Sequence, residues 1–244
     1  MIKIILSDTS KNCKHALSMC ESVLNWFEQS GIKIESKLPL VLHFDDTIRC
    51  PDFISAEKLN VRFNCIRINL PNDTKWNQTL FQLSHEICHY VIYLYNRDNY
   101  HIIKWIEESI CEAFSLYCLK YWSIKWNVIG FPYINRSYGK QMYKYRNDRL
   151  KQEVLHPSIL DDIDMNTLEI INNKSENERS YRHDFMCQLT NMISNNSIFG
   201  LIDYQKYVIS DILLDTEKYR SEYAENKCVN FICDTQNRIC EKNI

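Results

Sequence analysis

The chain has 244 residues, a formal net charge of −2, and ordinary fractions of apolar (45%) and charged (25%) residues. A chain of this length buries a sizeable core. Its charge balance argues against a nucleic-acid-binding protein, which needs a clear basic excess. No run of about eighteen apolar residues occurs, so we expect no membrane span.

The cysteine and glycine contents indicate the compartment and the class of fold. Eleven cysteines occur without a Cys-x-x-Cys pair, and the apolar run in residues 1–8 is too short for a signal peptide. We therefore expect a cytoplasmic protein whose cysteines are reduced and act as small apolar residues. Only four glycines are present, which favours long helices over glycine-dependent turns.

The first seventy residues predict one helix and two strands. Apolar side chains recur at intervals of three and four over residues 9–30, which predicts an amphipathic helix that ends at Gly31. Residues 38–44 and 60–70 predict strands. The acidic residues and the proline between the two strands indicate turns, and adjacent acids on a turn are usually solvated rather than metal-bound.

Residues 74–95 predict a helix that contains the sequence His-Glu-x-x-His, with His85, Glu86 and His89. Positions i and i+4 lie on one face of a helix, so both imidazoles point to one place and can bind a single zinc ion. Glu86 is rotated by about 100° from this face, next to the open position of such a metal. In the alternative interpretation, the two histidines are ordinary polar residues of a helix.

Residues 104–126 predict a second helix, on which Glu108 and Glu112 lie one above the other. Eighteen residues separate His89 from Glu108. This separation is long enough for a turn at residues 96–99 and for a second helix that packs antiparallel to the first.

These two segments resemble the gluzincins, the zinc peptidases with HExxH on one helix and a glutamate ligand on the next. The HExxH-x18-E spacing and the Trp-x-x-Glu pattern at residues 105–108 resemble the aminopeptidase-N-type branch. The resemblance covers about residues 65–122. It implies a Zn²⁺ cofactor bound by His85, His89 and Glu108, and a zinc metallopeptidase that acts on a peptide or protein substrate.

Three protein ligands leave one tetrahedral position for a water molecule, whose proton Glu86 accepts and passes to the leaving amine. Glu112 is expected to orient a ligand histidine, since the family often has an acid four residues after the glutamate ligand. The pattern Glu112-x-x-Ser115 also resembles the ligand motif of some members, which would make Glu112 the ligand. The loop length and the preceding Trp105 favour Glu108.

Two alternatives remain open for the metal. If Cys88 or Cys111 joined the zinc ion, the site would be closed and structural. The chain would also fit a catalytically inactive, zinc-stabilised binding or regulatory module with a gluzincin-like fold.

The resemblance suggests further site residues and a substrate class. The edge strand of the family's small sheet pairs with an extended substrate, and residues 65–70, with Ile66 and Ile68, are the candidate edge. The aminopeptidase motif Gly-x-Met-Glu-Asn has no equivalent at residues 60–72, which favours an endopeptidase or a dedicated processing enzyme. An amide hydrolase also needs an oxyanion donor, and the candidates are Tyr133, Tyr138, Tyr143 and His183.

Beyond the second helix, a helical region is expected from about residue 161 to residue 240. Acidic neighbours offset the tyrosine-rich, basic segment at residues 133–146, so no nucleic-acid surface is expected there. Apolar stripes with helical spacing occur at residues 163–171, 181–193, 204–214 and 219–240. The predicted fold is α+β and predominantly helical: a small β-sheet, the HExxH helix, an antiparallel glutamate-bearing helix and a helical C-terminal region. We assign residues 1–172 to the zincin-like core and 173–244 to a helical extension.

Overall fold

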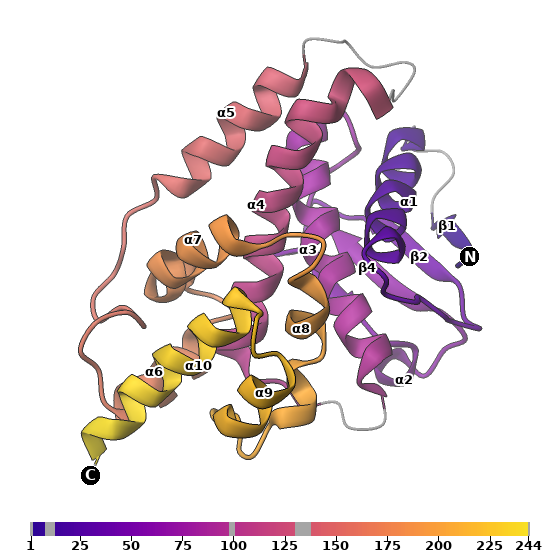
Figure 1. The fold of residues 1–244 in the computed structure, drawn as a ribbon. Helices are drawn as coiled ribbons and strands as arrows, with labels where there is room; N and C mark the ends of the chain where they lie inside the picture. The colour runs from indigo at the N-terminus through magenta and orange to yellow at the C-terminus, as the bar shows by residue number, and fades with distance from the viewer. Residues whose placement is uncertain (1, 8–12, 98–100, 130–137, 244) are drawn as a thin grey trace. The chain divides into compact units, whose positions relative to one another are not determined.

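The computed structural model describes residues 2–7, 13–97, 101–129 and 138–243. It confirms the α+β, predominantly helical class, with one small four-stranded sheet in the described residues (Figure 1). The chain forms two compact units, which we describe separately: Met1–Leu94 with Phe114–Arg149, and Tyr95–Ala113 with Leu150–Ile244. The predicted domain boundary near residue 172 stays a prediction.

The sheet of the first unit has the strand order β1-β2-β4-β3. Its strands are β1 (Ile4–Leu6), β2 (Leu40–Phe44), β3 (Asp52–Ile54) and β4 (Asn64–Ile68). β1, β2 and β4 are parallel, and β3 pairs antiparallel with β4. Along β2 alternate side chains are buried, the pattern of a strand with one face against the core.

The sheet order contradicts the predicted substrate edge. β4 lies between β2 and β3, and Ile66 and Ile68 are both fully buried. The backbone of Ile68 also accepts a hydrogen bond from the Asp45 amide. The expectation that residues 65–70 form the edge was therefore wrong, because it overlooked β3, a strand of three residues in a stretch that resembles turns. β3 is the edge strand on this side of the described sheet.

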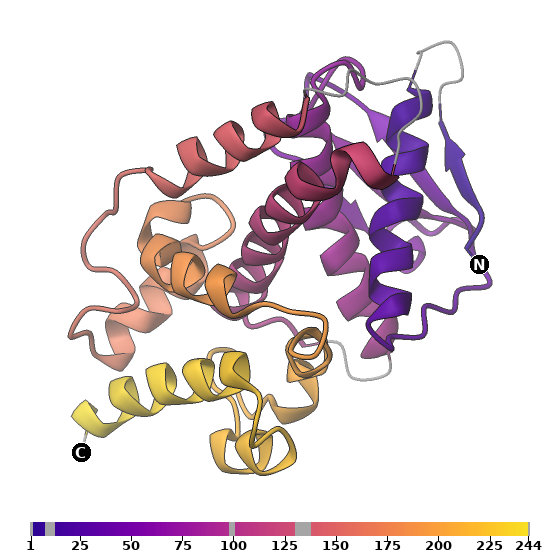
Figure 2. The same cartoon turned by 45° about the horizontal axis from the view of Figure 1, so that its top comes forward.

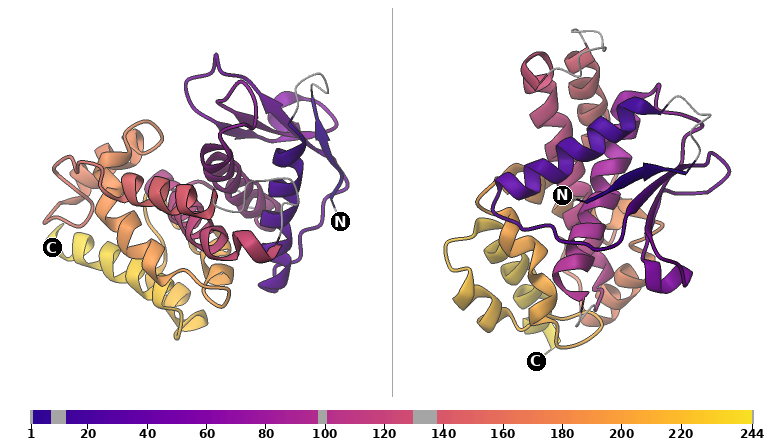
Figure 3. Two further views of the ribbon diagram at one scale, coloured as in Figure 1. Left: turned by 90° about the horizontal axis from the view of Figure 1, so that it is seen from above. Right: turned by 90° about the vertical axis from the view of Figure 1, so that its right-hand side faces the viewer.

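Two helices cover one side of this sheet (Figures 1 and 3). They are α1 (Lys14–Gln29) and α3 (Trp76–Tyr95), and the short α2 (Ala56–Leu59) precedes β4. α1 ends as predicted at Gly31, whose φ of 87° lies in the left-handed region that glycine adopts readily. Phe53 of β3 packs against Tyr90 and Tyr93 of α3, so aromatic contacts fix the edge strand on this helix.

The helix α4 (Lys104–Ile129) is unbroken, and its residues from Phe114 onward belong to the first unit. Phe114 packs against Trp26 and Phe27 of α1. Trp76, at the start of α3, packs against Trp126, near the end of α4. The contact between the two tryptophans places the start of α3 beside the end of α4, as the predicted antiparallel arrangement requires. α5 (Gly139–Leu150), which was not predicted, completes the described helices of the first unit.

The second unit is helical. It contains the first turns of α4 and the helices α6 (Met165–Lys174), α7 (His183–Met192), α8 (Ile198–Ile202), α9 (Thr216–Glu222) and α10 (Lys227–Cys240), with 3₁₀ turns at Arg179–Arg182, Tyr204–Tyr207 and Glu241–Asn243. α10 contacts α6, α7, α8 and α9 (Figure 2). Phe231 of α10 stacks on Phe185 of α7 with ring centroids 4.8 Å apart.

Two of the predicted helices differ from the structure. Residues 204–214 form a 3₁₀ turn and then an isolated bridge between Val208 and Leu214. Residues 219–240 are divided between α9 and α10, because Asn226 caps the second of these helices by accepting from the amides of Cys228 and Val229.

No helix in the described part of the chain is both long and apolar enough to cross a membrane.

Candidate metal centre

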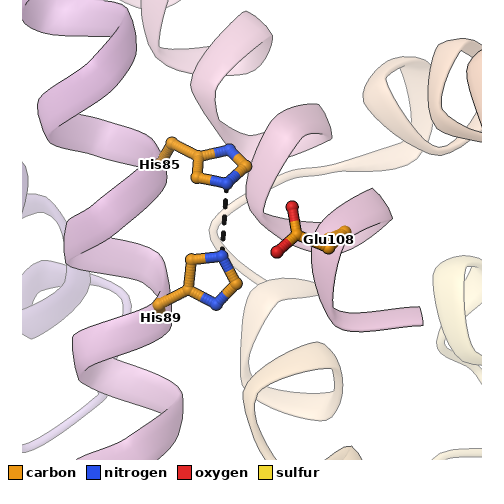
Figure 4. A group of neighbouring side chains, drawn as sticks. All are labelled: His85, His89 and Glu108. Carbon is orange, nitrogen blue, oxygen red and sulfur yellow. Dashed lines mark hydrogen bonds between the residues drawn. The ribbon is translucent and has the colours of Figure 1, made fainter. Parts of the chain in front are cut away.

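α3 brings His85 and His89 together. They are one turn apart on the helix, and their Nε2 atoms lie 3.2 Å from each other (Figure 4). His85 is buried and His89 is half-buried. Most of α3 is buried, including Leu83, Ile87 and Val91, so packing on several sides fixes the helix that carries both imidazoles.

The distance between the two imidazoles suits a zinc ion. Zinc binds histidine nitrogen at about 2.0–2.1 Å with tetrahedral geometry, which places two ligand nitrogens about 3.3 Å apart. The observed separation of 3.2 Å agrees with this value. The same distance suits an N–H···N hydrogen bond between two neutral imidazoles, which requires only that one Nε2 carries the proton.

Glu108 offers a third donor of a kind that zinc accepts. It lies in the first turns of α4, and one potential ligand atom from each of His85, His89 and Glu108 lies within 4.8 Å of the other two. Figure 4 shows the Glu108 carboxylate turned toward the imidazoles. Two histidines and a glutamate form the donor set of several catalytic zinc sites. The residues present therefore fit this metal.

Glu112 is not a member of this group, although its side chain is buried. Its carboxylate pairs with the guanidinium of Arg182 at 3.1 Å and with that of Arg179 at 3.5 Å. The choice of Glu108 over Glu112 as ligand remains a prediction that this geometry favours. The expected contact between Glu112 and a ligand histidine also remains a prediction.

Arg182 is the residue near the site that the sequence analysis missed. Its side chain is buried and contacts both Glu108 and Glu112. The contact to Glu108 joins residues 74 positions apart in the chain, so no local spacing pattern indicates it. The one available signal is an arginine within the apolar stripe at residues 181–193, where a buried charge needs a partner.

Glu86 follows His85 on α3 and is buried. Successive residues of a helix are rotated by about 100° about its axis. Its side chain therefore leaves the helix in a different direction from the two imidazoles. Its role as the base remains a prediction from the motif.

Neither cysteine considered as a fourth ligand belongs to the metal-binding group. Cys88 and Cys111 are fully buried. Cys88 lies near the thiol of Cys118, whose pKa is raised well above its ordinary value, mainly by burial. Such complete burial is typical of cysteines that fill space in a core.

The four oxyanion candidates have different surroundings. Tyr133 lies outside the described residues. Tyr138 donates a hydrogen bond to the Asn77 side chain at 3.0 Å, and Asn77 precedes His85 by eight residues, or about 12 Å along α3. Tyr143 is half exposed on α5, and His183 is buried, with Nε2 3.3 Å from the Leu150 carbonyl oxygen. These contacts place the Tyr138 hydroxyl away from the metal-binding group, and the other candidates remain predictions.

Comparisons of the chain with protein-family models, curated proteins and solved structures gave no match.

Proposed function

We propose that this protein is a zinc-dependent peptidase in which His85, His89 and Glu108 hold the metal. The observation that carries the proposal is the 3.2 Å separation of the two Nε2 atoms, together with a Glu108 oxygen within 4.8 Å of both ligand nitrogens. The separation of the two nitrogens matches that of two ligands on a tetrahedral zinc ion, and Glu108 adds a carboxylate to the donor set. The sequence spacing HExxH-x18-E supports the same assignment independently.

When bound, a zinc ion with three protein ligands supplies a water molecule whose pKa is about 7 and polarises the carbonyl under attack. Glu86 then acts as the general base and acid. Its carboxylate accepts a proton from the attacking water and delivers it to the nitrogen of the leaving amine. The balanced reaction is hydrolysis of a peptide or similar amide bond to an acid and an amine.

The substrate is an extended peptide or a protein segment. β3 is an edge strand and packs on α3, the helix that carries both histidines. An edge strand binds peptide backbone without regard to most side chains, so β3 takes the role that the sequence analysis gave to Ile66 and Ile68. Because residues 60–72 contain no Gly-x-Met-Glu-Asn motif, we favour an endopeptidase or a processing enzyme over an aminopeptidase.

The test compares wild-type protein with Glu86→Gln, using elemental analysis for zinc and a quenched-fluorescence peptide library for cleavage. We expect about one zinc per chain in both proteins, and a loss of turnover of about 10²- to 10⁴-fold in the variant. Glu57→Gln is the matched control. The Glu57 carboxylate accepts a hydrogen bond from Tyr93 in the last turn of α3 and does not belong to the metal-binding group, so this control should retain zinc and turnover.

A wild-type protein that binds no zinc when zinc is supplied would overturn the proposal. Zinc-loaded wild type that cleaves no peptide would instead favour the zinc-stabilised binding or regulatory module.

A further inference from the structure

Arg182 has four hydrogen-bonding or ionic contacts and almost no contact with solvent. Its side chain is 1% exposed. Nε donates to the Ser175 carbonyl at 3.2 Å, and Nη1 donates to the Glu108 carbonyl at 3.0 Å. Nη1 also lies 3.1 Å from Oε2 of Glu112, and Nη2 lies 3.5 Å from Oε2 of Glu108. Arg182 and its three partners, Ser175, Glu108 and Glu112, all belong to the second unit.

The two hydrogen bonds to backbone carbonyls fix the position and orientation of the Arg182 guanidinium. Carbonyl oxygens of Ser175 and Glu108 hold Nε and Nη1 of Arg182, and the guanidinium group is planar, so the direction of its remaining N–H groups is set. Arg182 therefore offers the two carboxylates a charge at a defined position. A surface lysine or arginine, with a flexible stem, does not provide this.

The carboxylates of Glu108 and Glu112 need a cation at a fixed position beside them. Glu108 and Glu112 are four residues apart on α4, the spacing at which like charges on a helix repel. Glu112 is 2% exposed and Glu108 is 16% exposed, so solvent screens this repulsion only weakly. A guanidinium shared by both carboxylates offsets the repulsion and restricts the rotamer of Glu108.

We propose that Arg182 is a positioning residue of the metal centre, which holds the Glu108 carboxylate in the orientation needed to bind zinc. This inference rests on the proposed function, because it assumes that Glu108 is a zinc ligand. A carboxylate that is already oriented loses less conformational entropy when the metal binds. Arg182 thus raises metal affinity without touching the metal or the substrate.

Two other arginines provide controls. Arg179 is more exposed, at 34%, and its ion pair is with Glu112 at 3.5 Å. Arg220 forms an exposed ion pair with Asp234 that joins α9 to α10. We expect Arg220→Gln to leave zinc binding unchanged, and Arg179→Gln to weaken it less than the same change at Arg182.

The experiment measures zinc affinity by competition with a chromophoric chelator, and records the visible absorption spectrum of the Co²⁺-substituted protein. We expect Arg182→Gln to weaken zinc binding about 10- to 100-fold, the usual effect of removing a group that orients a ligand. The cobalt spectrum should change, since it reports the geometry of the ligand set. Arg182→Lys keeps the charge but not the planar fork, and should restore part of the affinity.

A purely structural role predicts a different result. In that case the variants would have lower melting temperatures, while the folded protein kept wild-type zinc affinity and a wild-type cobalt spectrum, which would overturn the inference. If Arg182→Gln does not fold, Arg182→Lys decides: weakened affinity supports the inference, and wild-type affinity overturns it.

The two proposals fail in distinguishable ways. Wild-type protein without zinc contradicts the proposed function and the inference together. Wild-type protein that binds zinc, with unchanged affinity in both Arg182 variants, contradicts the role of Arg182 alone. Zinc affinity is measured without a substrate, so this test does not depend on peptide cleavage.

Discussion

The hydroxyl of Tyr204 donates a hydrogen bond to the carboxylate of Glu107, which is fully buried and also accepts a bond from Gln205 at 2.9 Å. Its neighbour Glu108 contacts Arg182 and belongs to the metal-binding group. Successive helix residues point about 100° apart. Two adjacent glutamates of α4 therefore lie in different environments and allow a matched comparison.

We expect Glu108→Ala to remove zinc and Glu107→Gln to retain it. Loss of Glu108 leaves two histidines, which bind metal poorly. Glu107 is not a member of the metal-binding group, and the amide that replaces it still accepts hydrogen bonds. The Glu107 change should instead lower the free energy of unfolding by about 1–3 kcal/mol, because it disturbs two buried hydrogen bonds, from Tyr204 and from Gln205. Zinc content after dialysis and urea unfolding measure the two effects. Zinc loss in the Glu107 variant alone would contradict the assignment.

Glu112→Ala should weaken zinc binding without abolishing it. Glu112 contacts Arg182 and Arg179, so its removal disturbs the group that orients Glu108 rather than the donor set itself. Loss of such a group typically costs about 10- to 100-fold in metal affinity. Chelator competition, run beside the Glu108 variant, measures the difference. If the Glu112 variant lost the metal and the Glu108 variant kept it, the ligand spacing would be x22 and Glu112 would be the third ligand.

Local sequence patterns predicted the helices that carry the candidate site. α1, α3 and α4 are long segments with helical apolar spacing, and Gly31 ends the first of them as expected. The strand at residues 38–44 was also predicted, as β2. Four of the shortest elements were missed, namely β1, β3, α2 and α8, because three to five residues carry no measurable period. Because the sequence analysis did not predict β3, it placed β4 at the edge of the sheet.

The long-range contacts of the site were not predictable from local patterns. The ion pair of Arg182 with Glu108 joins residues 74 positions apart, and the bond from Tyr204 to Glu107 joins residues 97 positions apart. Spacing rules operate over one or two helical turns. They identified His85, His89 and Glu108 through a known motif, but they gave no information on which side chains surround these residues.

The exposed pair of His156 and Asp161 should titrate as a unit. His156 Nδ1 lies 2.8 Å from Asp161 Oδ2, and this hydrogen bond raises the pKa of His156 above its ordinary 6.5. While Asp161 is ionised, the pair therefore contributes its full stabilisation below pH 6.5, and loses it as the pH rises through the folded-state pKa of His156. The pKa of Asp161 is lowered, first by His156 and then by the Ser158 amide, so its own contribution is lost as the pH falls through that lower value.

NMR titration of the histidine ring protons measures this effect. We expect Asp161→Asn to lower the pKa of His156 toward 6.5, because the charged partner is lost. An unchanged His156 pKa in that variant would show that the hydrogen bond does not form in solution.

Thiol labelling should distinguish Cys50 from the buried cysteines. Cys50 is exposed, eight others are buried, and all eleven are free thiols. Burial raises the pKa of Cys65, Cys228 and Cys233 to about 11, so about one in a thousand of these groups is a thiolate at pH 8, and the thiolate is the reactive form. We expect one fast-reacting thiol in the native protein, absent in Cys50→Ser, slower labelling of the half-buried Cys187 and Cys240, and eleven reactive thiols after unfolding in urea. Fewer than eleven in unfolded, unreduced protein would reveal a disulfide, and rapid native labelling of several thiols would contradict the packing of the core.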